Sequence, residues 1–331
     1  MQNNLTKNKN YVRVAVGVII AADGAVLLSS RPADKPWAQW WELAGGKIEA
    51  GESVFDALQR ELKDEIGITI TAATPWVKYV HEYAVNTVEL NFYRVTAWQG
   101  DPTPLEQQRV AWHYPGLPIP LAIGPILPAT FPILRWLQLA DRYLISSIGG
   151  VAGIAPWLQR LKAALEDGVG LVQFREPAWA ATEAELFEVL QQTVALCDQY
   201  GAYCLLNSVH PTAWLPHTDG LHLRSRDAAA LLAQQQSVPI TPDQLLAVST
   251  HNAAEIAQAK QLKSDFIVLG HVLPTPSHPD APPLGWEQFA VLAAEAGRPV
   301  FALGGQSADT AAVARAHGAH GIAALRSQYD G

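Results

Sequence analysis

From about residue 143 onward, apolar runs with the length of strands alternate with helical stretches rich in Ala, Leu and Glu. The eight runs are Tyr143–Ser146, Gly170–Phe174, Tyr203–Asn207, Gly220–Leu223, Leu245–Ser249, Phe266–Leu269, Pro299–Leu303 and Gly321–Ala324. The helical stretches between them include Glu183–Tyr200, Asn252–Lys260, Trp286–Ala296 and Asp309–His317. Strands that are apolar on both faces and separated by helices form parallel sheets. Eight of them within residues 141–331 predict a compact (β/α)8 TIM barrel.

The chain before this region has a different pattern, with short strands, turns and one clear helix. Strands are expected at Val12–Ala21, Ala25–Ser29, Trp76–Tyr83, Thr87–Trp98 and Val110–His113. The helix should run from Ser53 to Ile66, with Gly67 just past its end, and a second helix should cover Phe131–Leu139. The fold class is therefore α/β and α+β. We expect a loose polar tail at 1–10, a domain with a mixed sheet and flanking helices at 11–140, and the barrel at 141–331.

The composition excludes several classes of protein. With a net charge of -8 and only 16% charged residues, the chain lacks the basic face of a nucleic-acid binder. The apolar run Val14–Ala22 is too short to span a bilayer and ends in a turn, which favours a strand over a signal peptide. Two cysteines, Cys197 and Cys204, cannot build a disulfide framework. These features favour a cytoplasmic protein without a membrane anchor.

The chemistry-bearing residues gather on the first helix. Glu61, Asp64 and Glu65 stand at positions i, i+3 and i+4 and so share one helix face. Leu58, Leu62 and Ile66 form the adjacent apolar stripe. Carboxylates placed side by side repel one another unless a cation lies among them, and hard oxygen ligands suit Mg²⁺ or Mn²⁺. The alternative is a solvated acidic helix face.

The residues around this face resemble the Nudix hydrolase motif. The matching positions are Gly46, Glu52, Arg60, Glu61, Glu65 and Gly67. Asp64 departs from the motif, since the family has Glu there. The resemblance implies that Glu61, Asp64 and Glu65 hold the metal together with the Gly45 carbonyl. It also implies that Glu52 and Arg60 form a structural pair.

A closer resemblance is to the MutT type, the 8-oxo-dGTP diphosphatases. It rests on the segments Ser30–Asp34, Gly45–Glu49 and Trp98–Pro102, followed by Glu106. The resemblance implies that Glu106 is a further metal ligand and a general base, so that the catalytic set is Glu61, Glu65 and Glu106. The implied substrate-binding residues are Arg31, Gly46, Lys47, Asn86 and Thr130. Asn86 stands where that subfamily has Arg, and Thr130 stands where it has the Asn that hydrogen-bonds the purine, so selection of 8-oxoguanine is less well supported than diphosphate hydrolysis.

Residues 143–327 resemble the thiamine phosphate synthase/TenI family. The matching segments include Gly170–Glu176, Gly220–Leu223, Pro282–Gly285 and Ala302–Gly305. Gln173, Arg175, Asn207, Asp227, Ser249 and Thr275 agree with its substrate-binding or metal positions. Gly304 and Gly305 would bind a phosphate through backbone N–H groups, although a tight turn alone would also account for them.

Three substitutions remove charge from the synthase site. Pro177 and His278 replace lysines, and Ser208 replaces an Asp that binds Mg²⁺. We therefore expect a degenerate barrel that binds a phosphate-bearing ligand but does not make thiamine phosphate. His278 could instead be a new acid or base, although a solvated loop residue is the simpler interpretation.

Together these features predict a metal-dependent pyrophosphohydrolase that cleaves 8-oxo-dGTP or dGTP to the monophosphate and diphosphate. Two alternatives stay open at this point. The substrate could be a thiamine-related diphosphate, or the chain could be a non-catalytic nucleotide-sensing module.

Overall fold

The structure, a computed structural model, describes residues 10–275 and 281–325. Contacts divide the chain into two compact units, Met1–Gln138 and Leu139–Gly331. The division falls slightly before the expected start of the barrel at residue 141. Leu139 belongs to the second unit because its side chain is buried and its carbonyl lies 2.9 Å from Nε2 of the buried His320.

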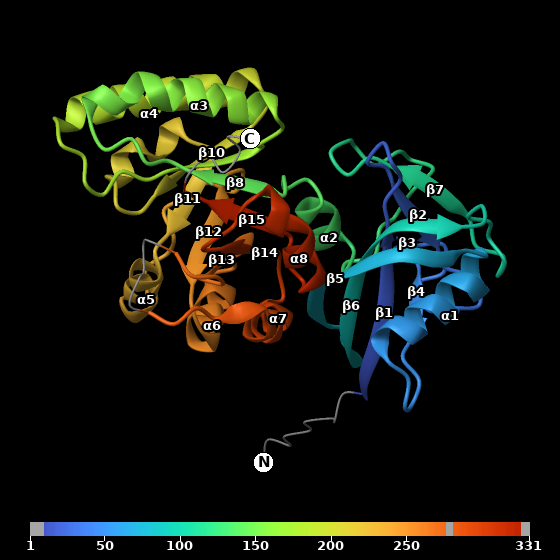
Figure 1. The fold of residues 1–331 in the computed structure, drawn as a ribbon. Coiled ribbons are helices and arrows are strands. Elements are labelled where there is room, and N and C mark those ends of the chain that lie inside the picture. The colour runs from blue at the N-terminus through green and yellow to red at the C-terminus, as the bar shows by residue number, and fades with distance from the viewer. Residues whose placement is uncertain (1–9, 276–280, 326–331) are drawn as a thin grey trace, which may run out of the picture. The chain divides into compact units, whose positions relative to one another are not determined.

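Residues 10–138 of the N-terminal unit form two sheets and two helices, which Figure 1 labels. Its elements are β1 (Asn10–Ile19), β2 (Val26–Ser30), β3 (Trp41–Glu42), β4 (Gly45–Lys47), α1 (Val54–Ile66), β5 (Thr69–Glu82), β6 (Asn86–Gln99), β7 (Val110–His113) and α2 (Phe131–Trp136). One sheet has the order β4-β1-β6-β5 and the other β3-β2-β7. In the first sheet β1 pairs parallel to β6 and antiparallel to β4, so the expected mixed sheet is confirmed.

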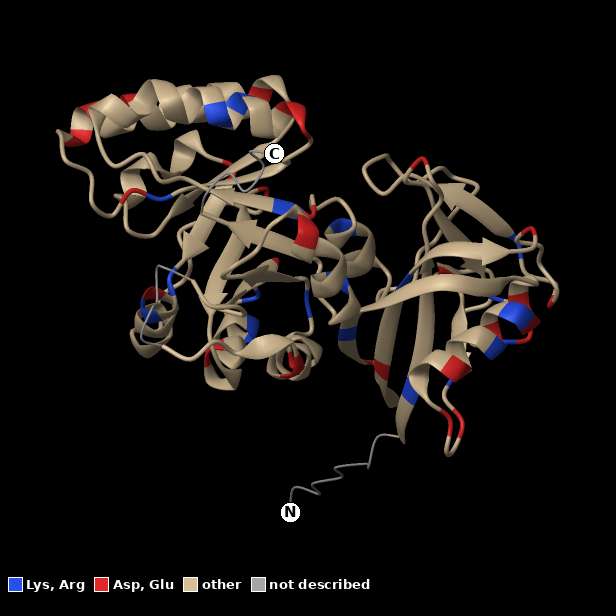
Figure 2. Cartoon of the chain, in the orientation of Figure 1, with Lys and Arg blue, Asp and Glu red and all other residues tan. Residues whose placement is uncertain are grey.

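Helix α1 begins and ends where its sequence signals lie. The Ser53 side chain accepts a hydrogen bond from the Asp56 N–H, and Gly67 ends the helix in the left-handed conformation at φ 74°. Leu58, Leu62 and Ile66 are fully buried and form part of the core of this unit. Burial of this stripe orients α1, and charged residues occur along the length of the same helix (Figure 2).

The second unit is a closed parallel barrel whose eight strands follow in chain order (Figure 1). The strands are β8 (Arg142–Ile145), β9 (Leu171–Phe174), β10 (Tyr203–Asn207), β11 (Gly220–Leu223), β12 (Leu245–Thr250), β13 (Phe266–Gly270), β14 (Val300–Leu303) and β15 (Gly321–Ala324). The helices are α3 (Ile154–Glu166), α4 (Glu183–Gln199), α5 (Ser225–Ala233), α6 (Ala253–Gln261), α7 (Gly285–Ala296) and α8 (Ala311–Ala316), with short 3₁₀ turns at Val151–Gly153, Thr212–His217 and Ala308–Thr310. The predicted TIM barrel is confirmed.

Several predicted boundaries are wrong. Strand β5 begins at Thr69 rather than Trp76, because its first half pairs with β6 through bulges that hide the alternation of apolar residues. The helix expected to reach Leu139 ends at Trp136. The expected tail, residues 1–10, lies outside the described residues except for Asn10, which begins β1 opposite Asn86.

Both cysteines are buried and free. Within the described parts of the chain, the helices are all too short or too polar to cross a membrane.

Candidate active site

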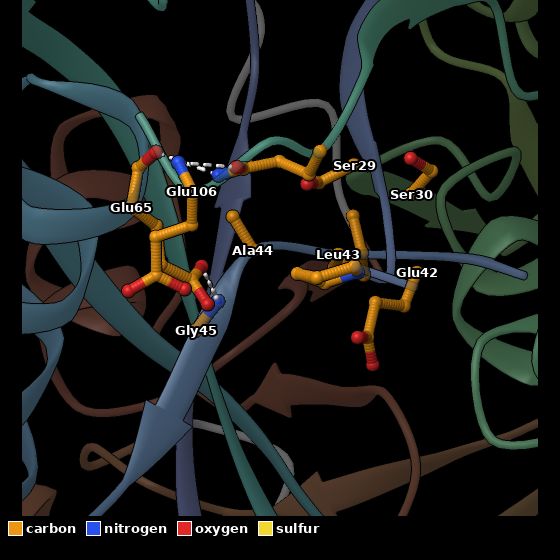
Figure 3. A pocket seen from close by; sticks show the side chains of 10 residues that line it. Ser29, Ser30, Glu42, Leu43, Ala44, Gly45, Glu65 and Glu106 are labelled. Atoms are coloured by element: carbon orange, nitrogen blue, oxygen red, sulfur yellow. Dashed lines mark hydrogen bonds between the residues drawn. The ribbon is translucent and has the colours of Figure 1, made fainter. Parts of the chain in front are cut away.

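A small pocket lies in the N-terminal unit, between the end of α1 and the segment that joins β3 to β4 (Figure 3). It is lined by Ser29, Ser30, Pro32, Glu42, Leu43, Ala44, Gly45, Glu65, Glu106 and Gln108. Three of these residues, Glu42, Glu65 and Glu106, are acidic and come from three separate segments of the chain. The pocket therefore presents carboxylate oxygens and backbone groups, with no basic side chain in its lining.

Glu65 is the most perturbed acid of this pocket. Its Oε2 accepts a hydrogen bond of 3.1 Å from the Gly45 N–H. The pKa of Glu65 is raised to about 8, first by burial and then by the carboxylates of Glu42, Glu61 and Glu106, against the opposing effect of the Gly45 hydrogen bond. The ionised form of Glu65 is unfavourable in this position, and a bound cation would stabilise it.

The loop that carries Glu106 is tied to the end of α1. The last carbonyls of a helix have no partner within the helix. The Glu65 carbonyl accepts from the Leu105 N–H at 2.9 Å and from Nε2 of Gln108 at 2.6 Å. Oε1 of Gln108 in turn accepts from the Glu106 N–H at 2.7 Å (Figure 3). Through these bonds the buried Gln108 positions Glu106 beside Glu65, a role that the sequence analysis missed.

Arg60 connects the loop before α1 to Glu61. Its guanidinium donates to both carboxylate oxygens of Glu52, at 3.0 and 2.9 Å, and to the Lys47 carbonyl at 3.1 Å. A further bond of 2.7 Å reaches Oε1 of Glu61. The hydrogen bonds from Arg60 lower the pKa of Glu52. In this arrangement Glu61 is held on the helix by Arg60 and contributes negative charge near Glu65.

The two glycines of β4 lie close to other atoms, to the backbone in one case and to a side chain in the other. A Cβ on Gly45, whose φ is 153°, would lie 2.2 Å from the Ala15 carbonyl oxygen in β1. A Cβ on Gly46 would lie 2.1 Å from the carboxylate of Glu61. Gly46 therefore leaves room for a catalytic side chain, in addition to any approach of substrate phosphates.

Glu42 is a second pocket residue that the sequence analysis missed. Its Oε1 lies 2.6 Å from Nη1 of Arg31, which also donates through Nε to the Pro36 carbonyl. Burial raises the pKa of Glu42, and Arg31 opposes this effect. Arg31 thus lies next to the pocket, although it is not among the lining residues. The only sequence signal for Glu42 was its place shortly before the paired glycines.

The remaining predicted residues lie elsewhere. Asp64 and Lys47 are exposed, and neither lines the pocket. Thr130 is buried at the start of α2 and does not line the pocket either. Gly45 pairs with Val16, which pairs with Phe92 of β6. Asn86 begins that strand and so lies about 20 Å from this pair along the strand direction.

The donors of the pocket fit a hard divalent cation in chemistry, since they are carboxylate and carbonyl oxygens. Their present geometry does not yet surround an ion. Within residues 10–275 and 281–325, no three acidic, His or Cys side chains converge closely enough to hold a metal. Glu61 is paired with Arg60 and Glu65 is bound to Gly45, so rotation of these two side chains would be needed to complete a metal site.

In the barrel, Gly304 and Gly305 follow β14 with φ of 95° and 65°. A Cβ on Gly304 would lie 2.4 Å from Cβ of His271, and one on Gly305 would lie 2.7 Å from Cβ of Leu273. The turn and its close packing therefore require glycine whether or not a phosphate binds there. Of the charge-removing substitutions, Pro177 is exposed, Ser208 is partly buried and His278 lies outside the described residues.

Two family models match the chain. The NUDIX domain matches residues 11–136, and the thiamine monophosphate synthase model matches residues 143–327. An 8-oxo-dGTP diphosphatase of Haemophilus influenzae is 36% identical over 105 residues, which are 32% of this chain and 77% of that protein. A CTP pyrophosphohydrolase of Escherichia coli is 37% identical over 122 residues, 36% of this chain and 87% of that protein. A thiamine-phosphate synthase of Synechococcus sp. is 36% identical over 146 residues, 44% of this chain but only 40% of the length of that protein.

A mixed sheet with an acidic pocket beside its helix, followed by a closed parallel barrel, makes this a two-domain protein of the α/β and α+β classes. The chain belongs to the Nudix hydrolase family through its N-terminal domain and to the thiamine monophosphate synthase family through its barrel.

Proposed function

We propose that the N-terminal domain is a metal-dependent nucleoside triphosphate pyrophosphohydrolase. The observation that carries the proposal is that Glu42, Glu65 and Glu106 all line one pocket, where burial and neighbouring carboxylates raise the pKa of Glu65 to about 8. An acidic cluster with this property favours a cation, and a cation in turn attracts a phosphate chain.

Mg²⁺, or Mn²⁺ in its place, would be held by Glu61, Asp64, Glu65 and Glu106 with the Gly45 carbonyl. The ion supplies charge neutralisation on the phosphates and lowers the pKa of the attacking water. Asp64 is the weakest member of this set because it is exposed and outside the pocket lining.

In the reaction a water oxygen bonds to a phosphorus atom and one bridging P–O bond breaks, which yields a monophosphate and diphosphate. The carboxylate of Glu106 accepts the proton of the water. Its exposed position in the pocket lining allows it to reach substrate and solvent. Gln108 keeps Glu106 beside Glu65. Glu61 would have to turn away from Arg60 to bind the ion.

The proposed substrate is a purine nucleoside triphosphate such as 8-oxo-dGTP or dGTP. Arg31 supports it, since its guanidinium lies beside the pocket, as does the similarity to an 8-oxo-dGTP diphosphatase. Gly46, Lys47, Asn86 and Thr130 complete the proposed substrate-binding set, although the positions of Asn86 and Thr130 give no direct support. Because the chain is also similar to a CTP pyrophosphohydrolase, CTP must be tested as an alternative substrate.

The test is incubation of the full chain with Mg²⁺ and 8-oxo-dGTP, dGTP, CTP or oxidised thiamine diphosphate, with measurement of released monophosphate. We expect turnover of a nucleoside triphosphate that is lost in the Glu65→Gln variant. If no nucleotide is hydrolysed, the enzyme interpretation fails and a nucleotide-sensing module remains. If the variant is as active as the parent, Glu65 is not part of the catalytic set. A higher kcat/KM for the thiamine compound would reject the nucleotide substrate.

For the barrel we propose binding of a small phosphate-bearing ligand without synthesis of thiamine phosphate. The turn at Gly304 and Gly305 would contribute backbone N–H groups. Thermal unfolding in the presence of inorganic phosphate tests this part separately, because a ligand that binds only the folded barrel raises its unfolding temperature.

A further inference from the structure

Three neighbouring strands of the barrel, β9, β10 and β11, are each followed by a polar residue. These residues are Arg175, Ser208 and Arg224. The carboxyl ends of barrel strands form one face, on which TIM barrels build their ligand sites. The three side chains therefore share one side of the barrel mouth.

One carboxylate oxygen of Asp227, in the first turn of α5, binds two members of this group. Its Oδ2 accepts from Oγ of Ser208 at 2.5 Å and from Nε of Arg224 at 2.5 Å. Nη2 of Arg224 also donates to the Ser208 carbonyl at 3.2 Å, and the Arg224 N–H donates to Oγ of Ser208 at 3.0 Å. The guanidinium of Arg224 is thus locked between the ends of two strands.

These residues do not fit the Mg²⁺ that the family resemblance implies here. Mg²⁺ demands near-octahedral oxygen ligands and is usually bound by one or two carboxylates. The position of one carboxylate is taken by the hydroxyl of Ser208, and the remaining carboxylate, Asp227, already binds Arg224. Arg224 therefore supplies the positive charge next to Asp227.

The guanidinium of Arg175 has hydrogen-bond donors that are not used within the described residues. Its side chain is partly buried, and within the described residues it makes no hydrogen bond or ion pair. The neighbouring Glu176 does not neutralise it directly, because the two oxygens of Glu176 accept from Oγ of Ser146 and from the N–H groups of Ile148 and Gly149. A partly buried guanidinium without a partner favours an anion.

The fields of the two arginines overlap. The pKa of His210 is lowered to about 4, first by burial and then by both Arg175 and Arg224. Arg175 also helps burial to lower the pKa of His222 to about 3. The histidines beside the arginines are therefore neutral near pH 7, so the positive charge of the site comes from Arg175 and from Arg224, which is paired with Asp227.

We propose that the barrel binds the phosphate group of a small phosphorylated ligand through Arg175 and Arg224 without a metal ion, with Arg224 in the place of the divalent cation. This inference deepens the proposed phosphate binding by the barrel and does not depend on the hydrolase activity. The ligand class is a phosphate monoester or diphosphate that binds as the free anion rather than as its Mg²⁺ complex.

The experiment is calorimetric titration of the full chain with inorganic phosphate and with inorganic diphosphate, each in EDTA and in Mg²⁺. EDTA removes any binding that needs a metal in the N-terminal domain. The variants are Arg175→Ala and Arg224→Ala, with melting curves to check folding. Arg226→Ala is the matched control, because Arg226 lies next to Asp227 on the same helix with 73% of its side chain exposed.

We expect binding in EDTA that is at least about tenfold weaker in both arginine variants and unchanged in the control, since a hydrogen bond from a charged donor contributes roughly a factor of ten or more. Binding that appears only with Mg²⁺ would overturn the inference, and this comparison needs no variant. Equal binding by parent and arginine variants would also overturn it while leaving phosphate binding by the barrel intact. No binding under any condition would reject both.

Discussion

From the raised pKa of Glu65 we predict how the stability of the metal-free protein changes with pH. In the folded protein this pKa is about 8, against an ordinary value of 4.5. Between these two values the folded protein keeps a proton on Glu65 that the unfolded chain has released. The free energy of unfolding must therefore fall as pH rises from about 4.5 to 8, because the unfolded state binds fewer protons there.

The size of the effect follows from the two pKa values. Each unit of difference in pKa corresponds to about 1.36 kcal/mol. The shifted pKa of Glu65 therefore lowers the free energy of unfolding by about 3 kcal/mol at pH 7 and by about 5 kcal/mol well above pH 8. Glu65→Gln removes this cost and keeps an oxygen that can accept from the Gly45 N–H. In EDTA at pH 8 the variant should be more stable than the parent by several kcal/mol.

The assay is hydrogen exchange of the α1 amides in EDTA from pH 5 to 9, corrected for the intrinsic exchange rates. This measurement reports on the N-terminal domain without interference from the barrel. Asp64→Asn is the matched control, since Asp64 neighbours Glu65 on the same helix but is exposed. The reasoning is refuted if the parent domain gains stability across this range, or if Glu65→Gln loses stability as the parent does.

Three further predictions concern function. The affinity for Mg²⁺ should rise between pH 6 and 8, by up to about tenfold per unit, because binding must displace the proton on Glu65; a flat calorimetric affinity would contradict this. Gly46→Ala should lower kcat about tenfold or more because its Cβ would meet the Glu61 carboxylate at 2.1 Å. The control is Gly51→Ala, at a glycine with open space around it and a φ of 85°. It should lower the stability by about 1–2 kcal/mol but leave kcat unchanged. If both variants lose kcat equally, contact with Glu61 is not the cause. The full chain should fail to support growth of a thiamine auxotroph without thiamine, because Pro177 and Ser208 remove charge from the synthase site, and growth would show that the lost charges matter less than we infer.

The elements that were predicted well depend on local patterns. The apolar stripe Leu58, Leu62 and Ile66, with Ser53 and Gly67 at its two ends, specified α1 to the residue. Three of these positions are core contacts and two are caps, so each acts within a few residues of its own place. The barrel followed from the same kind of evidence, since parallel strands buried on both faces are apolar throughout. Strand β5 was predicted too short because its bulges depend on pairing with β6.

The sequence by itself determined which residues could carry chemistry, because the motif spacing puts Glu61 and Glu65 on one helix face. Only the tertiary structure decided how deeply those residues are buried and which groups surround them. Glu42 reaches the pocket from β3, and Gln108 ties the Glu106 loop to a carbonyl 43 residues away. The pKa of Glu65 depends on burial and on carboxylates from other segments, and the engagement of Asp227 depends on the end of a neighbouring strand. Burial and charge are sums over neighbours in space, and a periodicity in sequence records only the neighbours along the helix or strand.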